Sequence, residues 1–156
     1  MTMSTGEETY LPRLNHVAFT MDRDRLDDAG RAEILDFYGD VFGWTEGDNT
    51  GERGNPLILY TGEFGQFIFL LPSEGAATGG TVDHFGLQVS TCEEIEDIVA
   101  RAKKRQASDD CVSVTDIHSR TTHGPVHEYT LTSAYIGFVI PLLVELQHLE
   151  RHDKPR

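Results

Sequence analysis

The stretches RLNHVAFTM (13–21) and TVDHFGLQV (81–89) decide the fold, because they are two versions of one strand. In each, apolar residues alternate with small or polar ones, which is the pattern of a strand with one buried face. Each places a histidine, His16 or His84, on the small and mixed face. The two stretches open the two halves of the chain, so the sequence predicts a duplicated module with the histidines at equivalent positions.

The residues after each of these strands have the spacing of an amphipathic helix. In DDAGRAEILDFYGDVFGW, Asp27 or Asp28 is suited to cap the start and Gly43 to end the helix. In the second half, Thr91 and Glu94 of TCEE predict a capping box. Both helices carry an apolar stripe at the i, i+3, i+4, i+7 spacing, namely Ile34, Phe37, Tyr38 and Val41 in the first and Ile95, Ile98, Val99 and Ala102 in the second.

Each half is expected to have the order βαβββ, which predicts a mixed α+β chain. Further strands are expected at 56–61 and 65–72, and near 111–119, 125–132 and 136–148, with TTHGP and SAYIG as turns. The second strand of the first half is poorly marked, around 44–50. The expected organisation is a flexible tail (1–12), a single domain (13–149) with module one at 13–72, a linker at 73–80 and module two at 81–149, and a C-terminal tail (150–156).

Composition excludes several classes of partner. The chain has 156 residues, with 26 acidic against 13 basic side chains and a formal net charge of −13. Such a surface offers little counter-charge to nucleic acid or to an anionic membrane. No apolar run approaches the roughly 18 residues of a membrane span, and the polar start is not a signal peptide. With only Cys92 and Cys111 as thiols, we expect a cytoplasmic protein with reduced cysteines.

Four segments resemble the vicinal oxygen chelate superfamily, which includes glyoxalase I, extradiol dioxygenases and bleomycin resistance proteins. LNHVAF is similar to the family's first strand, ILDFYGDVFGW to its first helix, DHFGLQV to the opening of its second module and LLVELQ to its final strand. The resemblance covers roughly residues 13–148. It implies two βαβββ modules whose strands curl into a cup that holds a divalent metal ion.

The resemblance also implies a ligand set. Carried over position by position, the metal ligands are His16, His84 and Glu145. A fourth family position lies near Phe69, where this chain has no carboxylate, amide or imidazole, so it departs from the glyoxalase I pattern. The remaining set of two histidines and one carboxylate matches the extradiol dioxygenase branch.

The chemistry of this set suits one Fe²⁺, Zn²⁺, Ni²⁺, Mn²⁺ or Co²⁺ ion, and no other cofactor is predicted. Three protein ligands leave room on the metal for a substrate with two adjacent oxygens. Simpler alternatives stay open. Each histidine taken alone is an ordinary half-buried side chain, and Glu145, in an apolar segment, is either partnered or at the wet end of its strand.

Two further residues are candidates for proton transfer beside the metal. His127 and Tyr129 share one face of a predicted strand and are suited to donate or accept a proton. Simple surface exposure is the alternative for both. The spacing of His123 and His127 does not make a zinc-protease helix, because the Gly-Pro pair between them is incompatible with a helix.

The leading functional interpretation is a divalent-metal-dependent enzyme that acts on a small chelating substrate. Its reaction is either like that of an extradiol dioxygenase or like that of a glyoxalase, epimerase or lyase. The alternative is a non-catalytic protein that binds or sequesters an antibiotic or another small molecule. A homodimer is expected, because single sheets leave exposed edges. The sequence leaves open the substrate, the metal, and whether the cup forms within one chain or between two.

Overall fold

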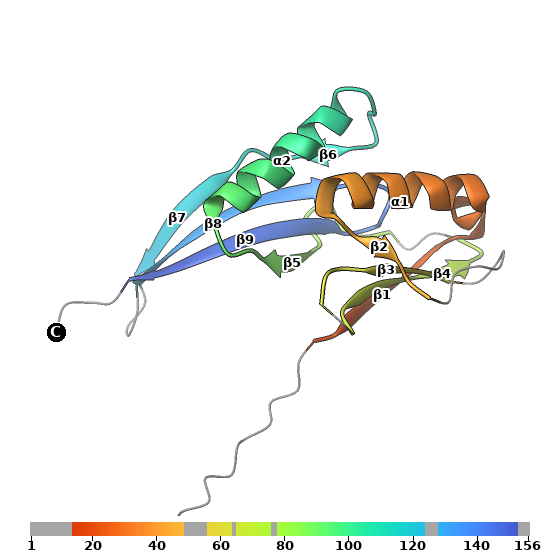
Figure 1. Ribbon diagram of the computed structural model, residues 1–156, viewed down its shortest axis with the longest axis horizontal. Helices are drawn as coiled ribbons and strands as arrows, with labels where there is room; N and C mark the ends of the chain where they lie inside the picture. Colours follow the sequence, from red (N-terminus) through yellow and green to blue (C-terminus); the bar gives the residue numbers. More distant parts are fainter. Residues whose placement is uncertain (1–13, 49–55, 64, 76–77, 124–127, 153–156) are drawn as a thin grey trace, which may run out of the picture.

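The computed structural model describes residues 14–48, 56–63, 65–75, 78–123 and 128–152, and it has the predicted mixed α+β architecture (Figure 1). The first half contains β1 (His16–Asp22), the 3-10 helix η1 (Arg23–Leu26), α1 (Asp28–Phe42), β2 (Thr45–Glu46), β3 (Leu57–Tyr60) and β4 (Phe67–Ser73). The second contains β5 (His84–Gln88), α2 (Cys92–Gln106), β6 (Ser113–Val114), β7 (His118–His123), β8 (Glu128–Gly137) and β9 (Leu143–His152).

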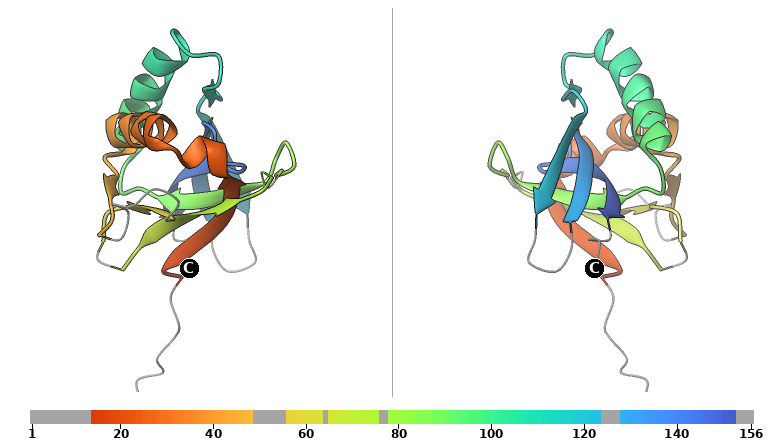
Figure 2. Two further views of the ribbon diagram at one scale, coloured as in Figure 1. Left: turned by 90° about the vertical axis from the view of Figure 1, so that its right-hand side faces the viewer. Right: turned by 90° about the vertical axis from the view of Figure 1, so that its left-hand side faces the viewer.

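The two halves form separate sheets with equivalent strand orders. The first sheet has the order β1-β4-β3-β2, and the second has the order β5-β9-β8-β6 with β7 also paired to β8. In both, the opening strand runs parallel to the closing strand, as β1 with β4 and β5 with β9. This equivalence confirms the duplication. It also leaves β1 and β5 at the edges of their sheets (Figure 2).

The alternation on the opening strands produces the predicted faces. On β1, Phe19 and Met21 are buried, whereas His16, Ala18 and Thr20 are exposed. On β5, exposed and half-buried residues also alternate, and Phe85 and Leu87 pack against the core. Both histidines therefore lie on the sheet face opposite the core.

Both helix boundaries follow from their capping residues. The Asp27 carboxylate accepts a hydrogen bond from the backbone N–H of Gly30 at 2.8 Å, and Gly43 ends α1 in the left-handed region at φ 74°. At α2, the Thr91 hydroxyl oxygen accepts from the Glu94 N–H at 3.2 Å. The returning bond differs from the standard capping box, because the Glu94 carboxylate accepts from the N–H one residue before the cap, that of Ser90.

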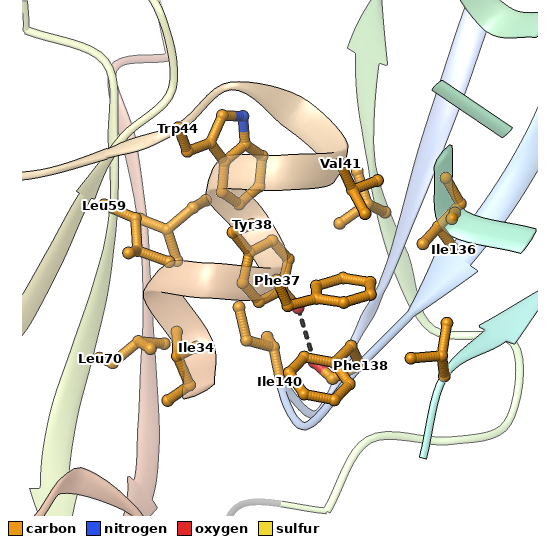
Figure 3. Packing of buried hydrophobic residues seen from close by; sticks show 14 of the residues in the cluster. Ile34, Phe37, Tyr38, Val41, Trp44, Leu59, Leu70, Ile136, Phe138 and Ile140 are labelled. Atoms are coloured by element: carbon orange, nitrogen blue, oxygen red, sulfur yellow. Dashed lines mark hydrogen bonds between the residues drawn. The ribbon is translucent and has the colours of Figure 1, made fainter. Parts of the chain in front are cut away.

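An aromatic core joins the two halves. Phe37 on α1 stacks against Phe138, which follows β8, with ring centroids 4.1 Å apart (Figure 3). The neighbouring Tyr38 is fully buried and donates its hydroxyl hydrogen to the Phe138 carbonyl oxygen at 2.6 Å. Its ring stacks on Trp44 with centroids 5.0 Å apart. Burial raises the pKa of Tyr38 far above its usual value.

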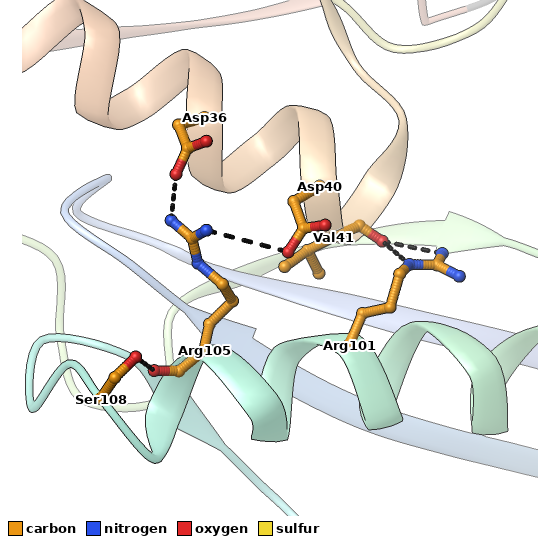
Figure 4. A network of polar contacts seen from close by, with 6 residues as sticks. All are labelled: Asp36, Asp40, Val41, Arg101, Arg105 and Ser108. Atoms are coloured by element: carbon orange, nitrogen blue, oxygen red, sulfur yellow. Dashed lines mark hydrogen bonds and ion pairs between the residues drawn. The ribbon is translucent and has the colours of Figure 1, made fainter.

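The two long helices are also tied by polar contacts (Figure 4). The Arg101 guanidinium of α2 donates to the Val41 carbonyl oxygen from Nε at 3.0 Å and Nη2 at 2.9 Å. It thereby satisfies a carbonyl in the last turn of α1, where no helical partner exists. Arg105 forms ion pairs with Asp36 and Asp40 on the solvent side.

The strands of the second half differ from those expected in three places. The predicted strand at 136–148 is the end of β8, a turn at 138–142 and the start of β9, so SAYIG lies inside β8 rather than in a turn. Pro141, which cannot donate a ladder hydrogen bond, lies in this turn. The segment at 111–119 is divided between β6 and β7, and β9 extends to His152, three residues past the predicted end of the domain.

Among the helices in the described ranges, none has the length and apolar character needed to cross a membrane.

Candidate metal centre

The fold brings His84 and Glu145 together from neighbouring strands. His84 opens β5 and Glu145 lies on β9, where it is paired in parallel register with Gly86. The His84 Nε2 atom lies 3.3 Å from Oε2 of Glu145. Glu145 is only 3% exposed and lies near the start of β9. The alternative that this carboxylate lies at a solvent-exposed end of its strand is therefore wrong.

A hydrogen bond of its other ring nitrogen, Nδ1, fixes the orientation of the His84 ring. Nδ1 lies 2.9 Å from the carbonyl oxygen of Val82, and because a carbonyl oxygen only accepts hydrogen bonds, Nδ1 carries the hydrogen. In the neutral ring, Nε2 then presents a lone pair to the carboxylate of Glu145. Two facing lone pairs repel each other unless a proton, carried by either side chain, or a metal ion lies between them. The pair therefore has the donor chemistry of a divalent-metal site.

Two polar side chains hold the buried carboxylate. The Gln147 amide Nε2 donates to Oε2 of Glu145 at 2.6 Å. Tyr135, directly opposite Glu145 on β8, donates its hydroxyl hydrogen to the same carboxylate. This hydrogen bond, together with partial burial and the negative charge of Glu145, raises the pKa of Tyr135.

His16 lies outside this group. It opens β1, is exposed, and stacks on Phe67 with ring centroids 4.8 Å apart and planes 3° from parallel. Its Nδ1 lies 2.9 Å from Oδ1 of Asn15. Within the described part of a single chain, no three His, Cys, Asp or Glu side chains are grouped so that they could hold a metal. The structure thus gathers two of the three predicted ligands, and the ligand role of the set stays a prediction.

Of the two proton-transfer candidates, Tyr129 alone lies in the described part of the chain. His127 lies outside the described residues. Tyr129 is opposite Arg151, six positions before Tyr135 on β8, which corresponds to about 20 Å along the strand. The tyrosine that contacts the pair is Tyr135, which sequence reasoning missed because the β8–β9 turn was expected at SAYIG. Gln147 could have been found from the sequence, because it is two residues after Glu145 and therefore on the same face of the strand.

A cavity of about 600 Å³ opens between β1 and β5. Its wall combines aromatic, aliphatic and polar side chains. The aromatic ones are Phe42, Trp44, Phe67 and Phe85, and the polar ones include Asn15, His16, Gln66 and Gln88. Gly86 also lines the cavity and is paired with Glu145 on β9, whereas Phe85 and Leu87 line it from the core face of β5.

Solved structures with this fold include proteins of low sequence identity. FosX, a fosfomycin resistance protein from Listeria monocytogenes, matches with a TM-score of 0.58 at 16% identity, over 93% of this chain and 97% of that one. A virulence protein from Salmonella typhimurium matches with a TM-score of 0.54 at 21% identity, over 89% and 98%. An integron cassette protein from the mobile metagenome of the Halifax Harbour sewage outfall matches with 0.54 at 18%, over 88% and 99%. At these identities the likeness establishes the fold alone.

Sequence comparison gives a more specific result. No curated protein matches the chain at a significant level. However, residues 13–131, which are most of the chain, match the family model of the Glyoxalase/Bleomycin resistance protein/Dioxygenase superfamily. The duplicated β1-β4 and β5-β9 pairing agrees with the architecture that the resemblance implied. This chain therefore belongs to the glyoxalase/bleomycin resistance protein/dioxygenase superfamily.

Proposed function

We propose that this protein is a divalent-metal-dependent enzyme that acts on a small substrate chelated through two adjacent oxygens. His84 and Glu145 are two of its metal ligands, and His16 is the third. The observation that carries the proposal is the pair itself, in which the imidazole Nε2 of His84 lies 3.3 Å from a buried carboxylate oxygen of Glu145. A metal ion bound between these two atoms would polarise substrate oxygens as a Lewis acid.

We further propose that His16 reaches the pair from a second copy of the chain. His16 is exposed on an edge strand, and β5 beside the pair is also an edge strand. Leu14 and Val82, two residues before the two histidines, are 80% and 76% exposed. Apolar side chains so exposed beside unpaired strand edges favour association with another strand. A homodimer would cover them and complete a three-ligand site.

The metal and substrate class are best approached through a related structure. A variant of FosX was solved in complex with Mn(II) and 1S,2S-dihydroxypropylphosphonic acid, a compound with two adjacent hydroxyl groups. Mn²⁺ is accordingly the first ion to test, followed by Fe²⁺, Zn²⁺, Ni²⁺ and Co²⁺, which suit the same ligands. We propose a cytoplasmic location, where the free thiols Cys92 and Cys111 would stay reduced.

A second candidate function is sequestration of a small molecule without catalysis. The aromatic wall of the cavity between β1 and β5 favours it, because such surfaces bind flat or apolar compounds without a metal. This function needs the cavity and not the His84–Glu145 pair. Metal content therefore separates the two candidates.

The test is elemental analysis of untagged protein, followed by calorimetric titration with Mn²⁺ and, under anaerobic conditions, Fe²⁺. The enzyme proposal expects one ion per chain in the wild type and a large loss of affinity in His84→Ala and Glu145→Ala. His148→Ala is the matched control, because His148 is on the same strand as Glu145 and bonds the backbone carbonyl of Val89 instead. Full metal content and unchanged affinity in both ligand variants would overturn the site assignment and favour sequestration.

A further inference from the structure

One side chain contacts both members of the pair. The ring of Tyr135 meets the His84 ring edge-on, with centroids 5.2 Å apart and planes 86° from parallel. Its hydroxyl group donates a hydrogen bond to Glu145. Because β8 and β9 are in register at these residues, the contact with Glu145 is set by the ladder itself.

The backbone of Tyr135 is fixed independently of the pair. Its N–H donates to the Thr115 hydroxyl oxygen at 2.9 Å, and its carbonyl oxygen accepts from the Thr115 N–H at the same distance. These two bonds anchor Tyr135 from the strand side opposite β9. The ring is thus held between a fixed backbone and the two side chains that it contacts.

We propose that Tyr135 is the positioning residue of the metal centre, which fixes the spacing of His84 and Glu145 before any ion binds. This inference rests on the proposed function. The hydroxyl group restricts rotation of the carboxylate, and the ring, which packs against the imidazole at nearly a right angle, limits rotation of His84 away from Glu145. Groups that orient metal ligands in this way contribute about 10- to 100-fold to metal affinity.

The experiment compares Tyr135→Phe with Tyr129→Phe in the untagged full-length protein. The first variant keeps the ring against His84 and loses only the bond to Glu145. The control removes a hydroxyl group from the same strand far from the pair. Co²⁺ is the probe, because its visible absorption reports ligand geometry as well as binding. We expect Tyr135→Phe to weaken Co²⁺ binding about tenfold or more and to shift the absorption bands, whereas Tyr129→Phe matches the wild type. Wild-type affinity and an unchanged spectrum in Tyr135→Phe would overturn the inference.

A measurement on the metal-free protein separates this inference from the proposed function. If the wild type binds no Co²⁺, Mn²⁺ or Zn²⁺, the proposed function fails, but Tyr135 can still be tested. The ¹⁵N resonance of His84 Nε2 should move in Tyr135→Phe and stay in place in Tyr129→Phe, with the His148 resonances as an internal control. A His84 signal that is identical in the wild type and Tyr135→Phe would show that Tyr135 does not position the pair.

Discussion

The Nε2 atom of His84 lies 3.3 Å from Oε2 of Glu145, although one residue opens the second half of the chain and the other lies near its end. The parallel pairing of β5 with β9 causes this approach, because it sets Gly86 directly beside Glu145 and leaves space above the carboxylate for the histidine. The consequences for metal binding, assembly and stability can each be measured.

Metal binding should stabilise the wild type and not the ligand variants. An ion that binds only the folded state adds about 2.7 kcal/mol when its free concentration is 100 times its dissociation constant. Differential scanning fluorimetry should therefore show a rise in Tm with Mn²⁺ in the wild type and in His148→Ala. His84→Ala and Glu145→Gln should show little or no rise. An equal rise in all four proteins would place the ion elsewhere.

Mixing two defective proteins should restore metal sites if each site is shared between chains. In a mixed dimer of His16→Ala and His84→Ala chains, one site lacks both histidines and the other has all three ligands. Equal amounts after subunit exchange should therefore give intact sites at about a quarter of the wild-type number. High-affinity Mn²⁺ binding, measured by electron paramagnetic resonance, is the readout. No recovery despite confirmed exchange would indicate a site within one chain.

Removing the Tyr38 hydroxyl should destabilise the core. Tyr38→Phe removes one of the two donors to the buried Phe138 carbonyl oxygen and leaves the Ile140 N–H as the other. The expected loss in the free energy of unfolding is about 0.5–1.5 kcal/mol, the net value of one hydrogen bond, measured by urea denaturation. Tyr60→Phe is the control, because the Tyr60 hydroxyl is exposed and its bond to Asp48 is long, at 3.4 Å. If Tyr60→Phe lost as much unfolding free energy as Tyr38→Phe, the stabilising role of the Tyr38 hydrogen bond would be contradicted.

The contribution of Tyr38 should disappear at high pH. Burial raises the pKa of this phenol in the folded state, so the folded protein favours the protonated form. Its contribution is complete below the ordinary tyrosine pKa of about 10 and falls above it, because the unfolded chain then gains by losing the proton. The difference in unfolding free energy between the wild type and Tyr38→Phe should shrink from pH 9 to about pH 11. A constant difference over this range would show that Tyr38 titrates normally.

Much of the fold was predictable because it depends on neighbours in the chain. The alternation in HVAFTMD and HFGLQ places His16 and His84 on the face opposite the core, and this depends only on the local order of residues in each strand. Likewise, Asp27, Gly43 and Thr91 set helix boundaries through bonds that span only a few residues. The repeat then established which strands are equivalent, and the strand pairing agrees with it.

Which residues make up the site depends on pairing between strands that are far apart in the sequence, and no local sequence pattern predicts that pairing. Tyr135 faces Glu145 only because the turn lies at 138–142, and a shift of one residue would turn one of the two side chains to the other face. The separation of His16 from the His84–Glu145 pair depends on how the two sheets pack, through contacts such as Phe37 with Phe138. The sequence alone thus determined which side chains face away from the core. Only the tertiary structure decided which of them meet, because that depends on strand register and on packing between modules far apart in the chain.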